Sequence, residues 1–213
     1  MDDREYWNKY YESHMPGSDG ESPFAQETYG RYLQHGGSIL DLGCGNGRDS
    51  LFFAARGLSV TGIDSADVAI RGLQEKGGAS FVCGDFVTLD GMADGSFDYC
   101  YSRFTVHAIS QEQEAGLLKN VLRVLRTGGK FFIEVRSVND AIYGKGEQKE
   151  QDAYVYEGHY RRFIRLRDFI DRLCDAGFAL EYAEESDRFA PYKDTRPVCI
   201  RITAVKTAER ASM

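Results

Sequence analysis

The 213-residue sequence contains no apolar run approaching the ~18 residues that a membrane-spanning helix needs. It opens with MDDREYW, which lacks the apolar segment of a secretory signal. These absences argue against a membrane partner, and we expect a cytoplasmic location.

Paired cysteines are also missing. The five cysteines stand singly, without a C-x-x-C pair or the spacing of metal ligands. We therefore expect no metal site and a reducing compartment. Cys83 and Cys100 lie in apolar runs, which predicts that both are small buried side chains.

Positive charge is outnumbered, with 26 Lys and Arg residues against 33 Asp and Glu residues. The resulting net charge of −7 argues against nucleic acid as the main partner. No internal repeat or low-complexity segment stands out. The composition, 42% hydrophobic and 28% charged, is typical of a globular protein, and the length suits one domain.

Strands and helices alternate through the middle of the chain. Short apolar runs predict strands at 38–42, 58–63, 79–83, 97–101 and 130–135, and the segments between them predict helices at 47–56, 66–76 and 111–126. Such alternation produces a parallel sheet with helices on both faces.

The two ends of the chain differ from this pattern. Helices are expected at 3–13 and 24–35, with a Gly- and Pro-containing loop at 14–23 between them. Residues 139–152 are polar and predict a mobile loop. A helix at 166–176, capped by Gly177, precedes strands at 178–183 and 198–205. Because no helix separates these two strands, they should pair antiparallel.

A glycine-rich turn follows the first predicted strand. Gly43, Gly45 and Gly47 form the pattern G-x-G-x-G before a helix, where glycine lets a ligand approach the backbone. Asp64 ends the second strand about 20 residues later, a spacing that suits ribose hydroxyls. Asp85 follows the third strand, where a carboxylate can accept the amine of an adenine.

The details of the turn indicate which ligand it takes. The third glycine comes one residue earlier than in the G-x-G-x-x-G of dinucleotide sites. Asp41 and Asp49 flank the turn; carboxylates there repel a pyrophosphate but suit a sulfonium and an α-amino group. The pattern therefore favours a sulfonium cofactor over a dinucleotide.

These motifs, together with LRTGG at 125–129, resemble class I S-adenosylmethionine-dependent methyltransferases over about residues 36–136. The resemblance implies a Rossmann-like three-layer α/β sandwich whose seven-stranded, mostly parallel sheet has the order 3-2-1-4-5-7-6, with the last strand antiparallel. It implies S-adenosylmethionine as cofactor and S-adenosylhomocysteine as product. The cofactor residues that it implies are Asp41, Gly43, Gly45, Asn46, Gly47, Arg48, Asp64, Ser65, Asp85, Phe86, Ser102 and Arg103.

The same resemblance divides a single methyltransferase domain, 1–213, into four parts. Residues 1–35 form N-terminal lid helices that carry Trp7 and Tyr11, and 36–136 form the cofactor-binding core. Residues 137–165 form a mobile insert on the substrate side. A helix and antiparallel strands complete the domain at 166–213.

A basic segment of the sequence indicates the chemical class of the methyl acceptor. Residues 154–167 carry four arginines with aromatic residues between them, and Arg136 ends the fifth strand. Arginine binds oxyanions in bidentate fashion, so we expect a small anionic acceptor. Since neighbouring strand residues face opposite ways, Arg161 and Arg162 cannot both enter the site from a regular strand.

The pieces RFTVHAI at 103–109, EVR at 134–136 and HYRRF at 159–163 resemble a subgroup near tellurite and thiopurine methyltransferases. They resemble more closely the phosphonate O-methyltransferase of dehydrophos biosynthesis. This likeness implies His107, Arg161 and Arg162 as catalytic residues. The substrate-binding residues are then Tyr29, His107, Arg136, Tyr160, Arg161, Arg162 and Lys193.

Other interpretations remain open. His107 is equally consistent with a core or capping histidine, and the arginines with a solvated strand face. A neutral or cationic acceptor would need His107 as a base, whereas an anionic oxygen would need none. Less favoured alternatives are a nucleotide-dependent oxidoreductase and a cofactor-binding module without chemistry. The oligomeric state is not readable from the sequence.

Overall fold

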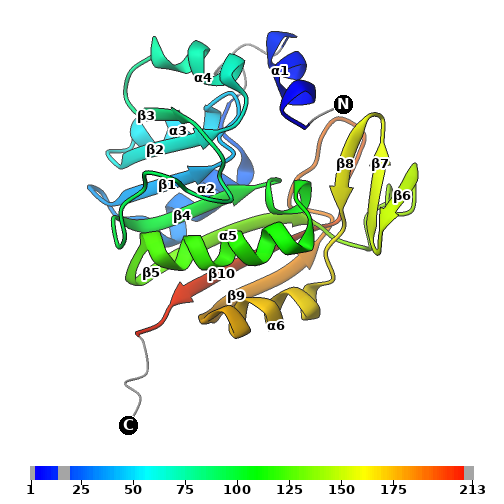
Figure 1. The fold of residues 1–213 in the computed structure, drawn as a ribbon. Helices are drawn as coiled ribbons and strands as arrows, with labels where there is room; N and C mark the ends of the chain where they lie inside the picture. The colour runs from blue at the N-terminus through cyan, green and yellow to red at the C-terminus, as the bar shows by residue number, and fades with distance from the viewer. Residues whose placement is uncertain (1–2, 14–19, 209–213) are drawn as a thin grey trace.

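The computed structural model describes residues 3–13 and 20–208. Its centre is a seven-stranded sheet in the order β3-β2-β1-β4-β5-β10-β9 (Figure 1). The strands are β1 Ser38–Leu42, β2 Ser59–Asp64, β3 Ser80–Cys83, β4 Phe97–Arg103, β5 Leu125–Arg136, β9 Phe178–Ser186 and β10 Cys199–Lys206. The first five are parallel, and β10 runs antiparallel to both β5 and β9. The predicted strand order and the antiparallel last strand are confirmed.

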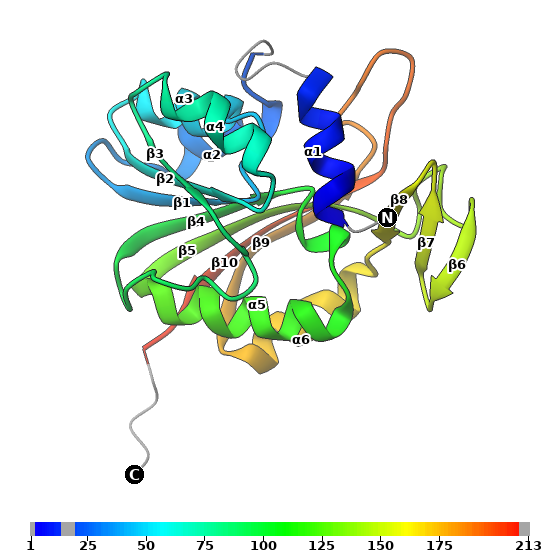
Figure 2. The same cartoon turned by 45° about the horizontal axis from the view of Figure 1, so that its top comes forward.

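Helices cover both faces of this sheet. They are α2 Pro23–Tyr32, α3 Arg48–Ala54, α4 Asp67–Gln74, α5 Gln111–Val124 and α6 Leu166–Ala176. Figure 2 shows α2, α3 and α4 on one side and α5 and α6 on the other. The larger apolar core lies between the sheet and α5 and α6, and a second core joins the sheet to α2 and α3. The expected three-layer sandwich is therefore present.

Helix α5 begins and ends for identifiable reasons. Ser110 and Gln113 form a reciprocal capping box at its start. The helix ends at Val124, before the glycine pair that was predicted to end it. Leu125 is fully buried and pairs with Phe97 of β4, so the chain becomes extended there and β5 starts earlier than expected.

Two further expectations are wrong. The end of the predicted loop 139–152 contains β6 Glu147–Glu150, which joins β7 Ala153–Tyr156 and β8 His159–Arg162 in a small antiparallel sheet. Glu157 and Gly158, with φ of 54° and 76°, turn the chain between β7 and β8. Cys83 is exposed, because β3 is a short edge strand, whereas Cys100 is buried as predicted.

Helix α1 Asp3–Ser13 crosses above the carboxyl ends of the sheet strands, between α4 and β8 (Figures 1 and 2). Most of the predicted loop 14–23 lies outside the described residues. In the part of the chain that the structure covers, no helix combines the length and apolarity needed to cross a bilayer.

Candidate active site

The glycine turn is fixed to the end of β2 by backbone hydrogen bonds. The N–H groups of Gly43 and Cys44 both donate to the Ile63 carbonyl, at 2.8 and 3.1 Å. The N–H of Gly45 donates to Asp64 Oδ2 at 2.9 Å. Burial raises the pKa of Asp64, and its backbone donors oppose that rise. The turn and the acidic residue that the sequence paired with it are therefore in direct contact.

Gly43 and Gly45 are required by both conformation and space. Their φ angles are 70° and 53°, which disfavour any residue with a side chain. A Cβ on Gly43 would lie 2.2 Å from Thr105 Cγ2, and a Cβ on Gly45 would lie 2.2 Å from the Tyr11 hydroxyl. The turn is thus a narrow cradle, with Tyr11 of α1 above it and Thr105 beside it.

The two carboxylates that flank the turn have different environments. Asp41 accepts a hydrogen bond from Ser50 Oγ at 2.6 Å, and burial raises its pKa to about 7. Asp49 accepts from Ser22 N and Oγ, both at 2.7 Å, and from the Tyr101 hydroxyl at 2.8 Å. Asp49 therefore joins the start of α2 to β4. Its position beside the glycines did not predict this structural role.

The predicted adenine-side residues lie next to the turn. Asp85 is exposed, and its Oδ1 accepts the N–H of Val87 at 2.7 Å. Phe86 is half-buried, with Cδ1 3.8 Å from the Cβ position of Gly43. The rim of the cradle thus offers a fixed carboxylate and an aromatic ring.

The other predicted cofactor residues surround the same turn. Asn46, Arg48 and Ser65 are half-buried, and Arg48 Nε lies 3.8 Å from Asp49 Oδ1. Ser102 hydrogen-bonds Thr105, a residue that the sequence did not single out. Arg103 turns toward β5, where its Nε donates to Glu134 Oε1 at 2.9 Å.

His107 lies on the short 3-10 helix η1 Val106–Ala108, directly after β4, and is almost fully buried. Its Nδ1 accepts the backbone N–H of Arg136 at 3.2 Å. Burial, reinforced by the charge of Arg136, holds the pKa of His107 well below its usual value. His107 is therefore neutral at pH 7, and because Nδ1 is an acceptor, Nε2 carries the proton.

The two adjacent arginines of β8 have different partners. Arg162 is buried in an ion pair with Glu114 and also donates to the backbone carbonyl of Ile109. Arg161 is half-buried and donates to the Tyr156 carbonyl at 3.2 Å. Among the described residues, no carboxylate pairs with Arg161, and burial and the charge of Arg136 lower its pKa. As expected from strand alternation, the two guanidinium groups have different surroundings: Arg162 is fixed by its ion pair with Glu114, and Arg161 is not.

His159, which the sequence analysis did not select, lies beside this group. It is 4% exposed, and its ring stacks on Tyr6 and meets Trp7 edge to face, at 5.0 and 4.9 Å. In the described part of the chain its Nδ1 has no hydrogen-bond partner. Burial lowers its pKa to about 3, with Arg161 contributing. The sequence feature that could have identified His159 is its position within the aromatic and basic segment 154–167.

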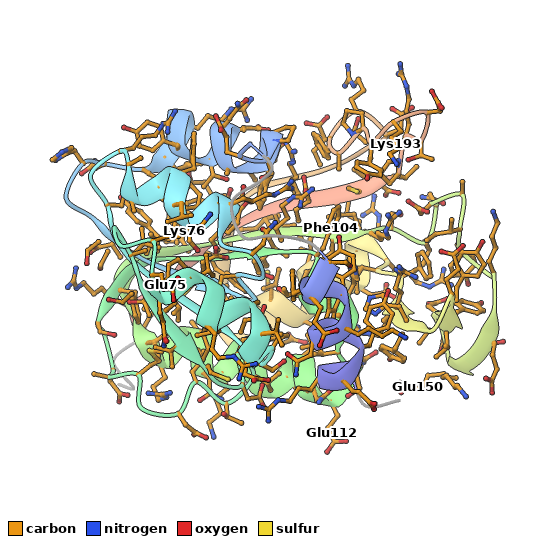
Figure 3. The ribbon with its side chains drawn as sticks, turned by 90° about the horizontal axis from the view of Figure 1, so that it is seen from above. Glu75, Lys76, Phe104, Glu112, Glu150 and Lys193 are labelled. Carbon is orange, nitrogen blue, oxygen red and sulfur yellow. The ribbon has the colours of Figure 1, made fainter. Side chains whose placement is uncertain are left out.

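Two predicted acceptor residues, Tyr29 and Lys193, have other surroundings, whereas Tyr160 lies on β8 between His159 and Arg161. Tyr29 packs against Phe52 in the second core, with the Arg56 guanidinium 5.5 Å from its ring. Lys193 is exposed on the connection between β9 and β10 (Figure 3), and its Nζ lies 5.3 Å from the ring of Tyr192. Tyr160 is half-buried on β8. The structure does not bring Tyr29 or Lys193 together with His107 and Arg161.

Helix α1 connects the two halves of the site. Asn8 Nδ2 donates to Asp67 Oδ1 at 2.8 Å, which joins α1 to the start of α4. Tyr6 and Trp7 pack on His159 of β8, and Tyr11 lies over Gly45. We call this helix, residues 3–13, the α1 lid, because it covers the glycine turn at one end and the basic residues at the other.

Known proteins resemble part of this chain in sequence. Residues 39–129 match a family model described as a methyltransferase domain. An uncharacterized methyltransferase of Schizosaccharomyces pombe is 29% identical over 170 residues, which are 73% of this chain and 64% of that protein. The chain spans less than two thirds of the length of three curated relatives that it matches, from 29% to 64%.

Solved structures agree on the fold. A S-adenosylmethionine-dependent methyltransferase of Methanosarcina mazei superposes with a TM-score of 0.76 at 23% identity, covering 90% of this chain and 100% of that one. The 1,6-didemethyltoxoflavin-N1-methyltransferase of Burkholderia thailandensis, solved with that compound and S-adenosylhomocysteine, has a TM-score of 0.72 at 20% identity, covering 96% and 86%. This chain therefore has the Rossmann-like α/β methyltransferase fold, and its residues 39–129 match the model of a methyltransferase domain.

Proposed function

We propose that this chain is a S-adenosylmethionine-dependent methyltransferase that methylates an oxygen of a small anionic molecule, such as a phosphonate, phosphate or carboxylate. The observation that carries the anionic acceptor is the charge around His107. Arg136 and Arg161 lie in one cluster with two carboxylates, Asp140, which pairs with Arg136 at 2.8 Å, and Glu157, which acts on Arg161 without a direct ion pair. The unpartnered Nδ1 of His159 belongs to the same cluster.

The residues around the glycine turn fit the cofactor. Gly43 and Gly45 leave the turn without side chains of its own. Thr105 and, from the α1 lid, Tyr11 contact the positions that the Cβ atoms of other residues would take there. Asp41 and Asp64 supply buried carboxylates, and their raised pKa values mean that a nearby cation would favour their ionised forms. Asp85 and Phe86 provide an acceptor and a ring at the rim, which suits an adenine.

The chemistry requires little beyond alignment. When bound, the cofactor supplies a methyl group on a sulfonium; an oxygen–carbon bond forms as the carbon–sulfur bond breaks and its electron pair stays on sulfur. An oxyanion loses no proton in this step, so no base is needed. The residues of this chain have to hold the acceptor oxygen in line and exclude water, for which Arg161 and the α1 lid are positioned.

The role of His107 follows from its hydrogen bond. A general base needs a free lone pair, but Nδ1 already accepts the Arg136 N–H and Nε2 carries the proton. His107 is therefore a neutral donor to the acceptor oxyanion rather than a base. This favours an ionised acceptor over the neutral or cationic one that would need His107 to take a proton.

Calorimetric titration tests the proposal in two stages. S-adenosylhomocysteine should bind and NAD should not; the reverse result would replace the methyltransferase with an oxidoreductase. With S-adenosylhomocysteine bound, methylphosphonate should bind about tenfold more weakly to Arg161→Ala, which loses a charged hydrogen-bond donor. Arg167→Ala, which removes an exposed arginine at the start of α6, is the control. Equal affinity in both variants would contradict the anionic acceptor.

A further inference from the structure

Phe104 has an unusual backbone conformation at the centre of the proposed acceptor site. It directly follows β4 with φ of 61°, in the left-handed region that residues with bulky side chains avoid. Its N–H donates to the Glu134 carbonyl at 2.8 Å, so the chain leaves β4 while remaining bonded to β5. Figure 3 labels this residue, which in that view lies beside one end of the α1 lid.

The strained turn fixes the ring of Phe104 among charged groups. The Arg103 guanidinium lies 4.4 Å and the Arg136 guanidinium 5.7 Å from the ring centroid, and the His107 ring lies 5.4 Å away. Both guanidiniums are held in turn, Arg103 by Glu134 and Arg136 by Asp140. Cations attracted to an aromatic face restrict how that ring can move.

Phe104 nevertheless remains half-buried rather than enclosed by the core. A strained residue persists only where its surroundings determine it, and such residues cluster at binding sites. Packing alone does not account for the strain, because the ring keeps part of its surface outside the core. The conformation does present a rigid aromatic surface beside Arg136 and His107.

We propose that Phe104 determines acceptor specificity: its ring is a platform for a flat, conjugated body, such as an aromatic ring, that carries the oxyanion held by Arg161 and His107. This rests on the proposed function and narrows its substrate class to aromatic oxyanions. The rings of Tyr6 and Trp7 pack on His159, which belongs to the same cluster. The proposed site therefore combines flat aromatic surfaces with fixed positive charge.

Two probes of equal charge test the platform. Benzoate and cyclohexanecarboxylate differ in the flat ring, and each is titrated into the protein saturated with S-adenosylhomocysteine. The wild type should bind benzoate about fivefold more tightly, as expected for an aromatic pair. Phe104→Leu should remove this preference and Phe104→Tyr should keep it. Glu157→Asn, at another residue with positive φ but in the β7–β8 turn, should leave the preference unchanged.

The stability of one further variant shows whether Phe104 serves acceptor binding or only packing. Phe104→Asn suits the left-handed conformation, so its melting temperature should equal or exceed that of the wild type while the benzoate preference is lost. A lower melting temperature would assign Phe104 to packing and overturn the proposal. So would equal binding of both probes, or binding of neither, by the wild type. Binding of S-adenosylhomocysteine is measured first, and its failure would instead count against the proposed function.

Discussion

Asp41 is a buried carboxyl whose ionisation opposes folding. Its pKa is raised to about 7, mainly by burial, whereas an Asp in an unfolded chain ionises near ~3.9. Between these values the folded state binds more protons than the unfolded state. The contribution of Asp41 to the free energy of unfolding therefore decreases as pH rises from ~4 to ~7 and is constant above that.

Asp41→Asn should remove this pH dependence while keeping an acceptor for Ser50. We expect the unfolding free energy of the variant, relative to that of the wild type, to be about 2.6 kcal/mol higher at pH 8 than at pH 5. Urea unfolding at the two pH values measures the difference. Asp90→Asn, which changes an exposed carboxyl, should show no such gain. An equal difference at both pH values would mean that Asp41 stays ionised.

At the residue scale, the sequence predicted where functional residues lie better than it predicted which side chains they contact. The spacing of Gly45 and Asp64 anticipated two residues that contact each other directly. Nothing in the sequence indicated that Asp49 accepts hydrogen bonds from Ser22 and Tyr101, because those partners come from distant segments. The alternation rule anticipated that the two arginines of β8 separate, but Glu114, which decides that Arg162 is the buried one, lies on α5.

At the scale of elements, the α1 lid is joined to α4 by polar contacts, of which those of Asn8 are the hydrogen bonds and that of Arg4 is a longer ion pair with Asp67 at 3.6 Å. Asn8 donates to Asp67 and accepts the N–H of Val68 at 3.3 Å, so it holds the lid at the start of α4. Losing these contacts should let the lid open more often. Since Tyr11 on the same helix covers Gly45, opening exposes the glycine turn.

Asn8→Ala should therefore speed amide hydrogen exchange in residues 3–13. Because the cofactor is proposed to lie under the closed lid, weakening the closed lid by about one net hydrogen bond should also weaken S-adenosylhomocysteine binding about fivefold. Lys9→Ala, at an exposed position of the same helix, provides the comparison. Exchange mass spectrometry and calorimetry report the two effects separately. If both variants behave as the wild type, Asn8 does not hold the lid.

The elements that the sequence predicted well are those with buried apolar faces. Helix α5 was visible from Leu117, Leu118 and Val121, all of which lie in the core. Strand β6 was not, because its sequence EQKE is exposed throughout and carries no alternation. Strand β6 pairs with β7 through a turn that contains Asp152 with φ of 59°, a conformation that the sequence does not indicate.

At the scale of the whole molecule, a buried ionic cluster joins the antiparallel end of the sheet to the parallel core. Glu134 of β5 is fully buried and pairs with Arg103 of β4 and Arg201 of β10, at 2.9 and 2.7 Å. Arg201 also pairs with Glu27 of α2 and donates to the Phe189 carbonyl. Four elements, β4, β5, β10 and α2, are therefore joined by two arginines and two glutamates, and Glu134 and Arg201 form the central pair.

Arg201→Met should destabilise the protein by about 3 kcal/mol, because it leaves Glu134 buried with one partner fewer while keeping the apolar volume. Urea unfolding at pH 7 measures this loss. Arg188→Met removes an arginine whose side chain is 77% exposed and should change the unfolding free energy by less than ~0.5 kcal/mol. Adding Glu134→Gln to Arg201→Met should restore part of the loss, because the buried charge is then gone. If the double variant is no more stable than Arg201→Met, the loss comes from packing of the arginine stem rather than from the unpaired carboxylate.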